Sequence, residues 1–293
     1  MTSLMWSIWM RGAALLIAMT VTSGNPQTKS TNDVTRCFIA GNLEVRPFTS
    51  KIFHNTRMLR IWLPPQYSHG LRSARYPVLY LNDGQDLFNA CTSVFNGQEW
   101  RVDETATDLI NSGKIPPMII VGIDNAGRID RAKEYLPFPD DTLTPAIPKV
   151  YGKQYPSFLL NEVIPFINRE YRTNPSPAAT GIGGSSYGAG IALYTAILLP
   201  GRFGKLLLES PSLYAHDNYL LKRADQFTRW PAKVYVGVGS INEPVEDVHR
   251  LAEAILRHKP GDRLLVVSTN GGAHNANAWA ERFPRALQFL YGK

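Results

Sequence analysis

Short runs of apolar or β-branched residues, each bounded by turn residues, recur along most of the chain. The clearest runs are Met58 to Leu63, Val78 to Leu81, Met118 to Ile123, Leu206 to Leu208, Val234 to Val238 and Leu264 to Ser268. Because these runs are apolar almost throughout rather than alternating with polar residues, they predict strands that are buried on both faces.

Apolar residues at helical spacing fall between and after these runs. They form three sets: Leu160, Val163, Ile164, Ile167 and Tyr171; then Val248, Leu251, Ala252 and Ile255; and finally Trp279, Phe283, Leu287 and Leu290. We expect Pro165 and Pro284 to kink or restart their helices. Strands alternating with helices predict an α/β fold, with a mainly parallel central sheet and helices on both faces. The carboxyl ends of the strands are where a site is expected in such a fold.

Composition narrows the class of protein. The chain has 293 residues, of which 44% are hydrophobic and 19% charged, as in a folded globular protein. Its net charge of +7 comes from scattered basic residues without a basic stripe, so no nucleic-acid partner is predicted. Two cysteines are too few for a disulfide-built scaffold or a four-thiolate zinc site.

The N-terminus has the order of a secretory signal peptide. Arg11 precedes an apolar stretch from Gly12 to Val21, and Thr22, Ser23 and Gly24 follow it. We therefore expect a signal peptide at residues 1–24, a flexible segment at 25–36 and a single domain at 37–293. This predicts a secreted or periplasmic protein with no membrane span after cleavage.

Two features of this region leave alternatives open. Apolar residues before Arg11, such as Trp6 and Trp9, lengthen the apolar zone and also allow an uncleaved N-terminal anchor. An oxidising compartment would permit a bridge between Cys37 and Cys91, but two unpaired cysteines are equally consistent with the sequence.

The most informative motif is Gly184-Ser185-Ser186-Tyr187-Gly188, which fits the G-x-S-x-G nucleophile elbow. In that elbow a serine stands on a strained turn between a strand and a helix, and the flanking glycines let the backbone pack closely. The spacing selects Ser186, because the residue two positions after Ser185 is a tyrosine. Dinucleotide and P-loop fingerprints fail on the same stretch, which lacks their third glycine and their Gly-Lys-Ser/Thr.

A base and an acid are expected later in the chain. His274 comes after the last predicted strand, at the edge of the sheet where Ser186 should lie, so it is the candidate base. The acid should fall between them, and Glu243, just beyond the strand from Val234 to Val238, is the leading candidate. Because Pro244 disfavours a helical Glu243, that carboxylate is expected in a loop, whereas Glu246 is expected in the first helical turn as a cap.

An oxyanion hole requires two backbone N–H donors. One is expected from Tyr187, the residue after the nucleophile, and the other from the loop that follows an earlier strand. That loop comes directly after Val78 to Leu81, and its Gln85 N–H is the candidate donor, with Gly84 allowing close approach.

With these pieces assembled, the chain resembles the putative esterase family of α/β-hydrolases. This family includes feruloyl and acetyl esterases, siderophore esterases, S-formylglutathione hydrolase and mycolyltransferases. The resemblance extends from about Phe38 to Leu290. It is carried by Asn82-Asp83-Gly84-Gln85-Asp86-Leu87-Phe88, Trp100 with Asp103-Glu104, Val121-Gly122-Ile123, Arg131 with Glu134-Tyr135-Leu136-Pro137, the serine elbow, Ser210-Pro211-Ser212-Leu213-Tyr214, and His274-Asn275 with Trp279.

The resemblance implies an α/β-hydrolase fold and a serine esterase with an acyl-enzyme intermediate. Some members of the family work with Ser and His alone, so the role of Glu243 as the acid stays a hypothesis. The expected substrates are acyl esters of carbohydrates, polysaccharides included, or similar small esters, and no metal or organic cofactor is expected. Alternatives are an acyltransferase that uses the same Ser186 and His274, and a noncatalytic carbohydrate-binding relative. No oligomeric state is predicted.

Overall fold

The computed structural model describes residues 37–95, 97–127, 130–140, 147, 149–258 and 263–292. The predicted signal peptide and flexible segment lie outside these residues and stay predictions. Within the described ranges, no helix combines the length and the apolar character needed to cross a bilayer.

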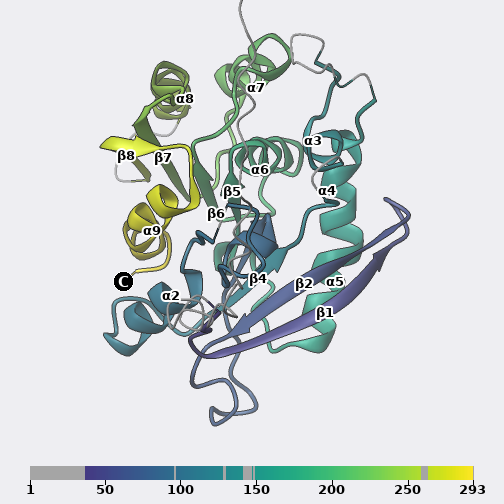
Figure 1. Cartoon of the computed structure of the whole chain (residues 1–293), viewed down its shortest axis with the longest axis vertical. Coiled ribbons are helices and arrows are strands. Elements are labelled where there is room, and N and C mark those ends of the chain that lie inside the picture. The colour runs from purple at the N-terminus through teal and green to yellow at the C-terminus, as the bar shows by residue number, and fades with distance from the viewer. Residues whose placement is uncertain are drawn as a thin grey trace, which may run out of the picture.

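An eight-stranded sheet runs through the described chain in the order β1-β2-β4-β3-β5-β6-β7-β8 (Figure 1). Its strands are β1 (Asn42–Ser50), β2 (Asn55–Leu63), β3 (Val78–Asn82), β4 (Ile119–Ile123), β5 (Thr180–Ser185), β6 (Lys205–Glu209), β7 (Lys233–Ile241) and β8 (Leu264–Ala273). β1 and β2 form an antiparallel hairpin at one edge, and β2 pairs antiparallel with β4. All the other pairs are parallel, which confirms the predicted mainly parallel sheet.

Helical segments connect the strands. They are η1 (Gly84–Asp86), α2 (Val102–Asn111), α3 (Arg131–Tyr135), η2 (Gly152–Gln154), α4 (Tyr155–Phe158), the π-helical η3 (Leu159–Val163), α5 (Ile164–Glu170), η4 (Pro177–Ala179), α6 (Tyr187–Leu198), α7 (Ala215–Gln226), α8 (Val245–His258) and α9 (Ala276–Tyr291). Pro165 is the second residue of α5, where the α-helix resumes directly after the π-helical η3. Pro284 lies inside α9 without ending it.

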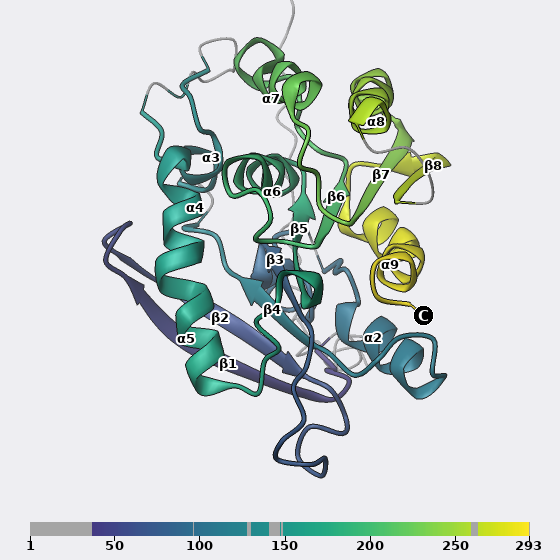
Figure 2. The ribbon, with the colours of Figure 1, turned by 180° about the vertical axis from the view of Figure 1, so that it is seen from behind.

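Both faces of the sheet are buried under helices. One face packs on α4 to α8, and the other packs on α2 and α9, which lie side by side (Figure 2). Alternate residues of β4 show this division, because Val121 belongs to the first core and Ile120 to the second. A strand with apolar side chains on both faces reads as a continuous apolar run, which is the pattern from which these strands were predicted.

Two strands lie outside the predicted set, and β7 and β8 run well past their predicted carboxyl ends. β1 is exposed over much of its length, and β5 is rich in glycine, so neither forms an apolar run. β7 continues to Ile241 and β8 to Ala273, past the predicted ends at Val238 and Ser268. The extra residues pair with each other, Ile241 with Ala273, beyond an irregularity that follows Gly239.

A disulfide joins Cys37 to Cys91, with their Cα atoms 5.5 Å apart. Of the two alternatives that the sequence left open, the structure therefore contains the bridge. It ties the segment before β1 to the loop between η1 and α2.

Candidate active site

Ser186 occupies a strained turn between β5 and α6. Its backbone has φ 55° and ψ −127°, a conformation that non-glycine residues rarely adopt. A Cβ atom on Gly184 would lie 2.8 Å from the carbonyl carbon of Gly188, and a Cβ on Gly188 would lie 2.7 Å from the Asp83 carboxylate. Only glycine fits at these two positions, and this is the geometry that G-x-S-x-G predicts.

The neighbouring strand holds this turn in place. The Ser186 N–H donates to the Glu209 carbonyl oxygen at 2.9 Å, while the Ser186 carbonyl accepts the N–H groups of Ala189 and Gly190 in the first turn of α6. The nucleophile candidate is thus bonded on one side to the end of β6 and on the other to the start of a helix.

Glu243 and His274 are brought together by the paired extensions of β7 and β8. The Nδ1 atom of His274 lies 3.0 Å from Oε2 of Glu243. The Glu243 side chain is fully buried, whereas 37% of the His274 side chain is exposed. Gly239 and Gly272 permit the close approach of the two strands, since a Cβ on Gly239 would lie 2.1 Å from the Gly272 carbonyl oxygen.

Glu246 lies away from this contact. It is exposed in the first turn of α8, where a carboxylate interacts favourably with the helix dipole. Of the two acids weighed from the sequence, Glu243 is therefore the one that contacts the histidine.

Ser186 and His274 border the same cavity, which has a volume of about 490 Å³. Its walls also include Ser212, Tyr214 and Asn242. The Ser186 hydroxyl oxygen lies 3.4 Å from that of Ser212, and the described hydrogen bonds do not join it to His274. In free enzymes the bond between nucleophile and base is often long and tightens when substrate binds.

The two candidate oxyanion donors both lie at the start of helical segments. Tyr187 is the first residue of α6, so its N–H has no partner within the helix. Gln85 lies in η1. Asp83, the residue just before η1, has a left-handed backbone with φ 59°, and this turns the chain into η1. A Cβ on Gly84 would lie 2.6 Å from the Gly122 carbonyl carbon, so the expected close approach occurs here, against β4.

The loop that carries Gln85 is fixed by polar contacts that the sequence did not suggest. Arg131 binds both carboxylate oxygens of Asp83 at 2.8 Å, and Asn125 donates to the same carboxylate. The Asn82 side chain donates to the Gly188 carbonyl oxygen at 2.7 Å. The loop is thereby bonded directly to the serine elbow.

A buried ion pair lies under the strand ends. The Glu209 carboxylate accepts from Arg282 at 2.9 Å and from the Tyr235 hydroxyl at 3.1 Å. Burial raises the pKa of Glu209 to about 7, against the opposing effect of Arg282. Since the Glu209 carbonyl also holds the Ser186 N–H, this pair supports the floor of the site.

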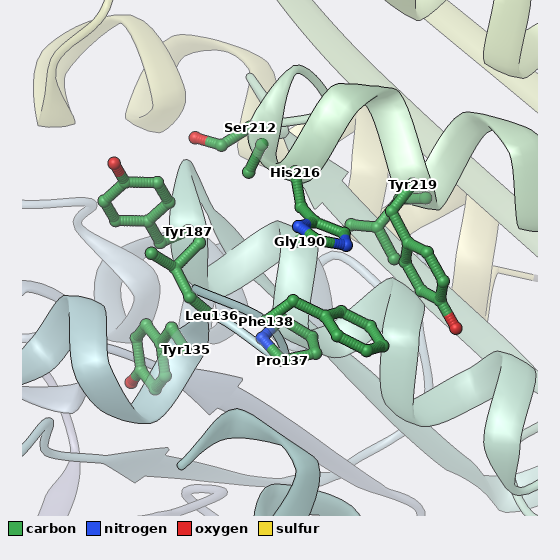
Figure 3. A pocket seen from close by; sticks show the side chains of 11 residues that line it. Tyr135, Leu136, Pro137, Phe138, Tyr187, Gly190, Ser212, His216 and Tyr219 are labelled. Atoms are coloured by element: carbon green, nitrogen blue, oxygen red, sulfur yellow. The ribbon is translucent and has the colours of Figure 1, made fainter. Parts of the chain in front are cut away.

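A second, much smaller cavity shares Ser212 with the larger one (Figure 3). Its volume of about 20 Å³ is enough for a water molecule. Aromatic side chains, Tyr135, Phe138, Tyr187 and Tyr219 among them, form much of its wall, and Ser212 borders both cavities.

Among the residues that the structure describes, no cluster of three or more His, Cys, Asp or Glu side chains is arranged to hold a metal ion.

The sheet order and the serine turn after β5 define the chain as an α/β-hydrolase fold. The sequence profile of the putative esterase family matches residues 50–290, so the chain belongs to the putative esterase family.

Similar known proteins include an uncharacterized relative by sequence and two esterases by structure. The protein YbbA of Bacillus subtilis, itself uncharacterized, is 24% identical over 255 residues, which cover 81% of this chain and 93% of YbbA. The crystal structure of the enterobactin esterase FES from Shigella flexneri superposes with a TM-score of 0.68 at 20% identity. The match covers 85% of this chain but only 58% of the FES chain. A ferulic acid esterase structure gives a TM-score of 0.67 at 19% identity, covering 86% of this chain and 98% of that one.

Proposed function

We propose that this protein is a serine carboxylic-ester hydrolase that works through an acyl-enzyme intermediate. The observation that carries the proposal is a single cavity bordered both by a serine on a strained elbow and by a histidine whose Nδ1 is bonded to a buried glutamate. This arrangement of nucleophile, base and acid is suited to acyl transfer.

In the proposed reaction, Ser186 Oγ attacks the ester carbonyl carbon while His274 Nε2 takes its proton. The same nitrogen then returns the proton to the departing alcohol, leaving the acyl group on Ser186. Water, activated by His274, cleaves this acyl-enzyme and regenerates the serine. No step requires a metal ion or an organic cofactor.

Glu243 has two roles in this scheme. By accepting a hydrogen bond from the Nδ1–H group it keeps His274 in the tautomer that leaves Nε2 free to act as base. Its buried charge also stabilises the imidazolium that forms during each transfer.

The N–H groups of Gln85 and Tyr187 are the proposed oxyanion donors. The ion pair between Arg131 and Asp83 supports this assignment, because it fixes the Gln85 loop before substrate binds. Fixed donors stabilise developing negative charge without having to reorganise during the reaction.

The proposed substrates are acyl esters of carbohydrates or similar small esters. The larger cavity supports this, because its walls present serine, tyrosine and asparagine side chains that can bond to a hydroxyl-rich alcohol. The similarity to a ferulic acid esterase and to an enterobactin esterase agrees with an ester substrate.

We also propose that the mature protein lies outside the cytoplasm, either secreted or periplasmic. The leader-like order of residues 1–24 supports this, as does the disulfide between Cys37 and Cys91, since such bonds persist in oxidising compartments.

A hydrolysis screen tests the activity. Wild type, Ser186→Ala and His274→Gln are compared on p-nitrophenyl esters of rising acyl length, on feruloyl esters and on acetylated sugars. We expect turnover on at least one class by wild type alone. Absence of turnover on every class, or equal turnover by the variants, would contradict the proposal.

A further inference from the structure

Ser210, the first residue after β6, has an unusual backbone for a serine. Its φ is 44°, in the left-handed region that favours glycine, and its side chain is completely buried. Its N–H donates to the Gly237 carbonyl oxygen at 2.8 Å. Because glycine adopts this conformation at lower cost, the backbone does not account for a serine at this position.

The hydroxyl of Ser210 bridges two side chains of the candidate site. It accepts the indole N–H of Trp279 at 3.1 Å and donates to Oε1 of Glu243 at 2.7 Å. An indole can only donate, and a carboxylate can only accept, so the direction of the hydroxyl proton is determined.

With this bridge, each oxygen of the Glu243 carboxylate accepts a hydrogen bond. Oε1 accepts from Ser210, while Oε2 accepts from His274 Nδ1. Trp279 also meets the histidine directly, with ring centroids 5.3 Å apart and ring planes at 83°. One tryptophan therefore packs against the imidazole and fixes, through Ser210, the carboxylate that orients it.

We propose that Ser210 is a positioning residue of this active site, which holds the Glu243 carboxylate in the geometry that orients His274, with Trp279 fixing the direction of its hydroxyl. This inference rests on the proposed function and adds a residue to its machinery. Ser210 acts through Glu243, and the reacting atoms belong to Ser186 and His274.

The charges around Glu243 determine what loss of the hydroxyl should do. Glu209 is a second buried carboxylate near Glu243, and it is paired with Arg282 and Tyr235. Without the Ser210 donor, the negative charge of the unprotonated Glu243 and His274 pair is less well stabilised. Once the pair has taken up a proton it is a weaker hydrogen-bond acceptor, so loss of the Ser210 donor destabilises the protonated pair less than the unprotonated pair. The pair should therefore gain its proton at a higher pH than in wild type.

The experiment compares Ser210→Gly and Ser210→Ala with wild type. We expect kcat to fall by about tenfold or more in both, because a hydrogen bond to a charged group has been removed. KM should be unchanged, and the acid limb of the kcat/KM profile should move to higher pH. Ser210→Gly relieves the strained φ, so its melting temperature should be the closer of the two to wild type.

Thr195→Val is a matched control. The Thr195 hydroxyl of the wild-type chain is as deeply buried as that of Ser210 but donates only to the Ile191 carbonyl within α6, at 2.7 Å. Thr195→Val should leave kcat and the acid limb of the kcat/KM profile unchanged. Trp279→Phe, which keeps an aromatic ring near His274 but lacks the N–H, should lower kcat in the same direction as the Ser210 variants.

Two results would overturn the positioning role. One is a folded Ser210→Gly with wild-type kcat, and the other is a fall in kcat with an unmoved acid limb, since the hydroxyl would then act outside the Glu243 and His274 pair. Ser186→Ala is assayed in parallel. If it is inactive while Ser210→Gly is fully active, only this inference fails; if Ser186→Ala is active, the proposed function itself fails.

Discussion

Replacing Glu243 by glutamine is expected to reduce catalysis severely while leaving the fold intact. The carboxylate is fully buried and accepts two hydrogen bonds, from His274 Nδ1 and from the Ser210 hydroxyl. In Glu243→Gln the amide oxygen can still accept from Ser210, and the amide nitrogen then faces His274. An N–H donor there favours the tautomer with its proton on Nε2, which cannot take the proton of Ser186.

The cost of the wrong tautomer can be up to about ten-thousandfold in kcat, which corresponds to about 5 kcal/mol of transition-state stabilisation. The matched control is Glu246→Gln, which removes an exposed carboxylate from the first turn of α8 and should cost at most about 1 kcal/mol of stability with little change in rate. Steady-state hydrolysis of a p-nitrophenyl ester and thermal melting give both quantities. A folded Glu243→Gln with wild-type kcat would refute the reasoning and indicate a Ser186 and His274 dyad.

Two further predictions concern stability. Burial, together with the adjacent Glu104 carboxylate, raises the pKa of Asp103 to about 8. The folded chain therefore keeps a proton that the unfolded chain loses above about pH 4, so this group makes the fold less stable as pH rises from there toward 8. We expect Asp103→Asn, whose amide oxygen can still accept the Ala40 N–H, to raise Tm at pH 8 but hardly at pH 4 in calorimetry; an equal change at both would count against it. The disulfide closes a loop between residues 54 apart in sequence, and its loss through Cys91→Ser should cost about 4 kcal/mol of unfolding free energy. Reducing agent should lower the Tm of wild type but not of this variant, and equal Tm values without it would contradict the expectation.

Much of the architecture follows from local pattern. Strands such as β4 bury both faces, so their apolar runs are visible in the sequence, and the mainly parallel sheet was predicted from them. β5 was harder to see, because glycines that permit the elbow take the place of apolar side chains. The extensions of β7 and β8 are held by pairing with each other, which no local pattern records.

The candidate site likewise contains residues that could be predicted from the sequence and residues that could not. Ser186 stands in a spaced motif, and His274 and Glu243 follow predicted strands, so strand order alone places them at one edge of the sheet. Ser210, Trp279 and Arg131 act through contacts between segments far apart in sequence. Their residue types indicate nothing by themselves, and the family motifs named them without indicating a role.

The most direct test of the central claim is to find where a serine-directed phosphonate or a trapped acyl group attaches. Wild type and Ser186→Ala are incubated with the reagent, digested, and the modified peptide is located by mass spectrometry. The account predicts one adduct on Ser186, formed in step with loss of turnover and absent from Ser186→Ala. An adduct on Ser185 or Ser212, or full turnover by an enzyme completely modified at Ser186, would contradict it.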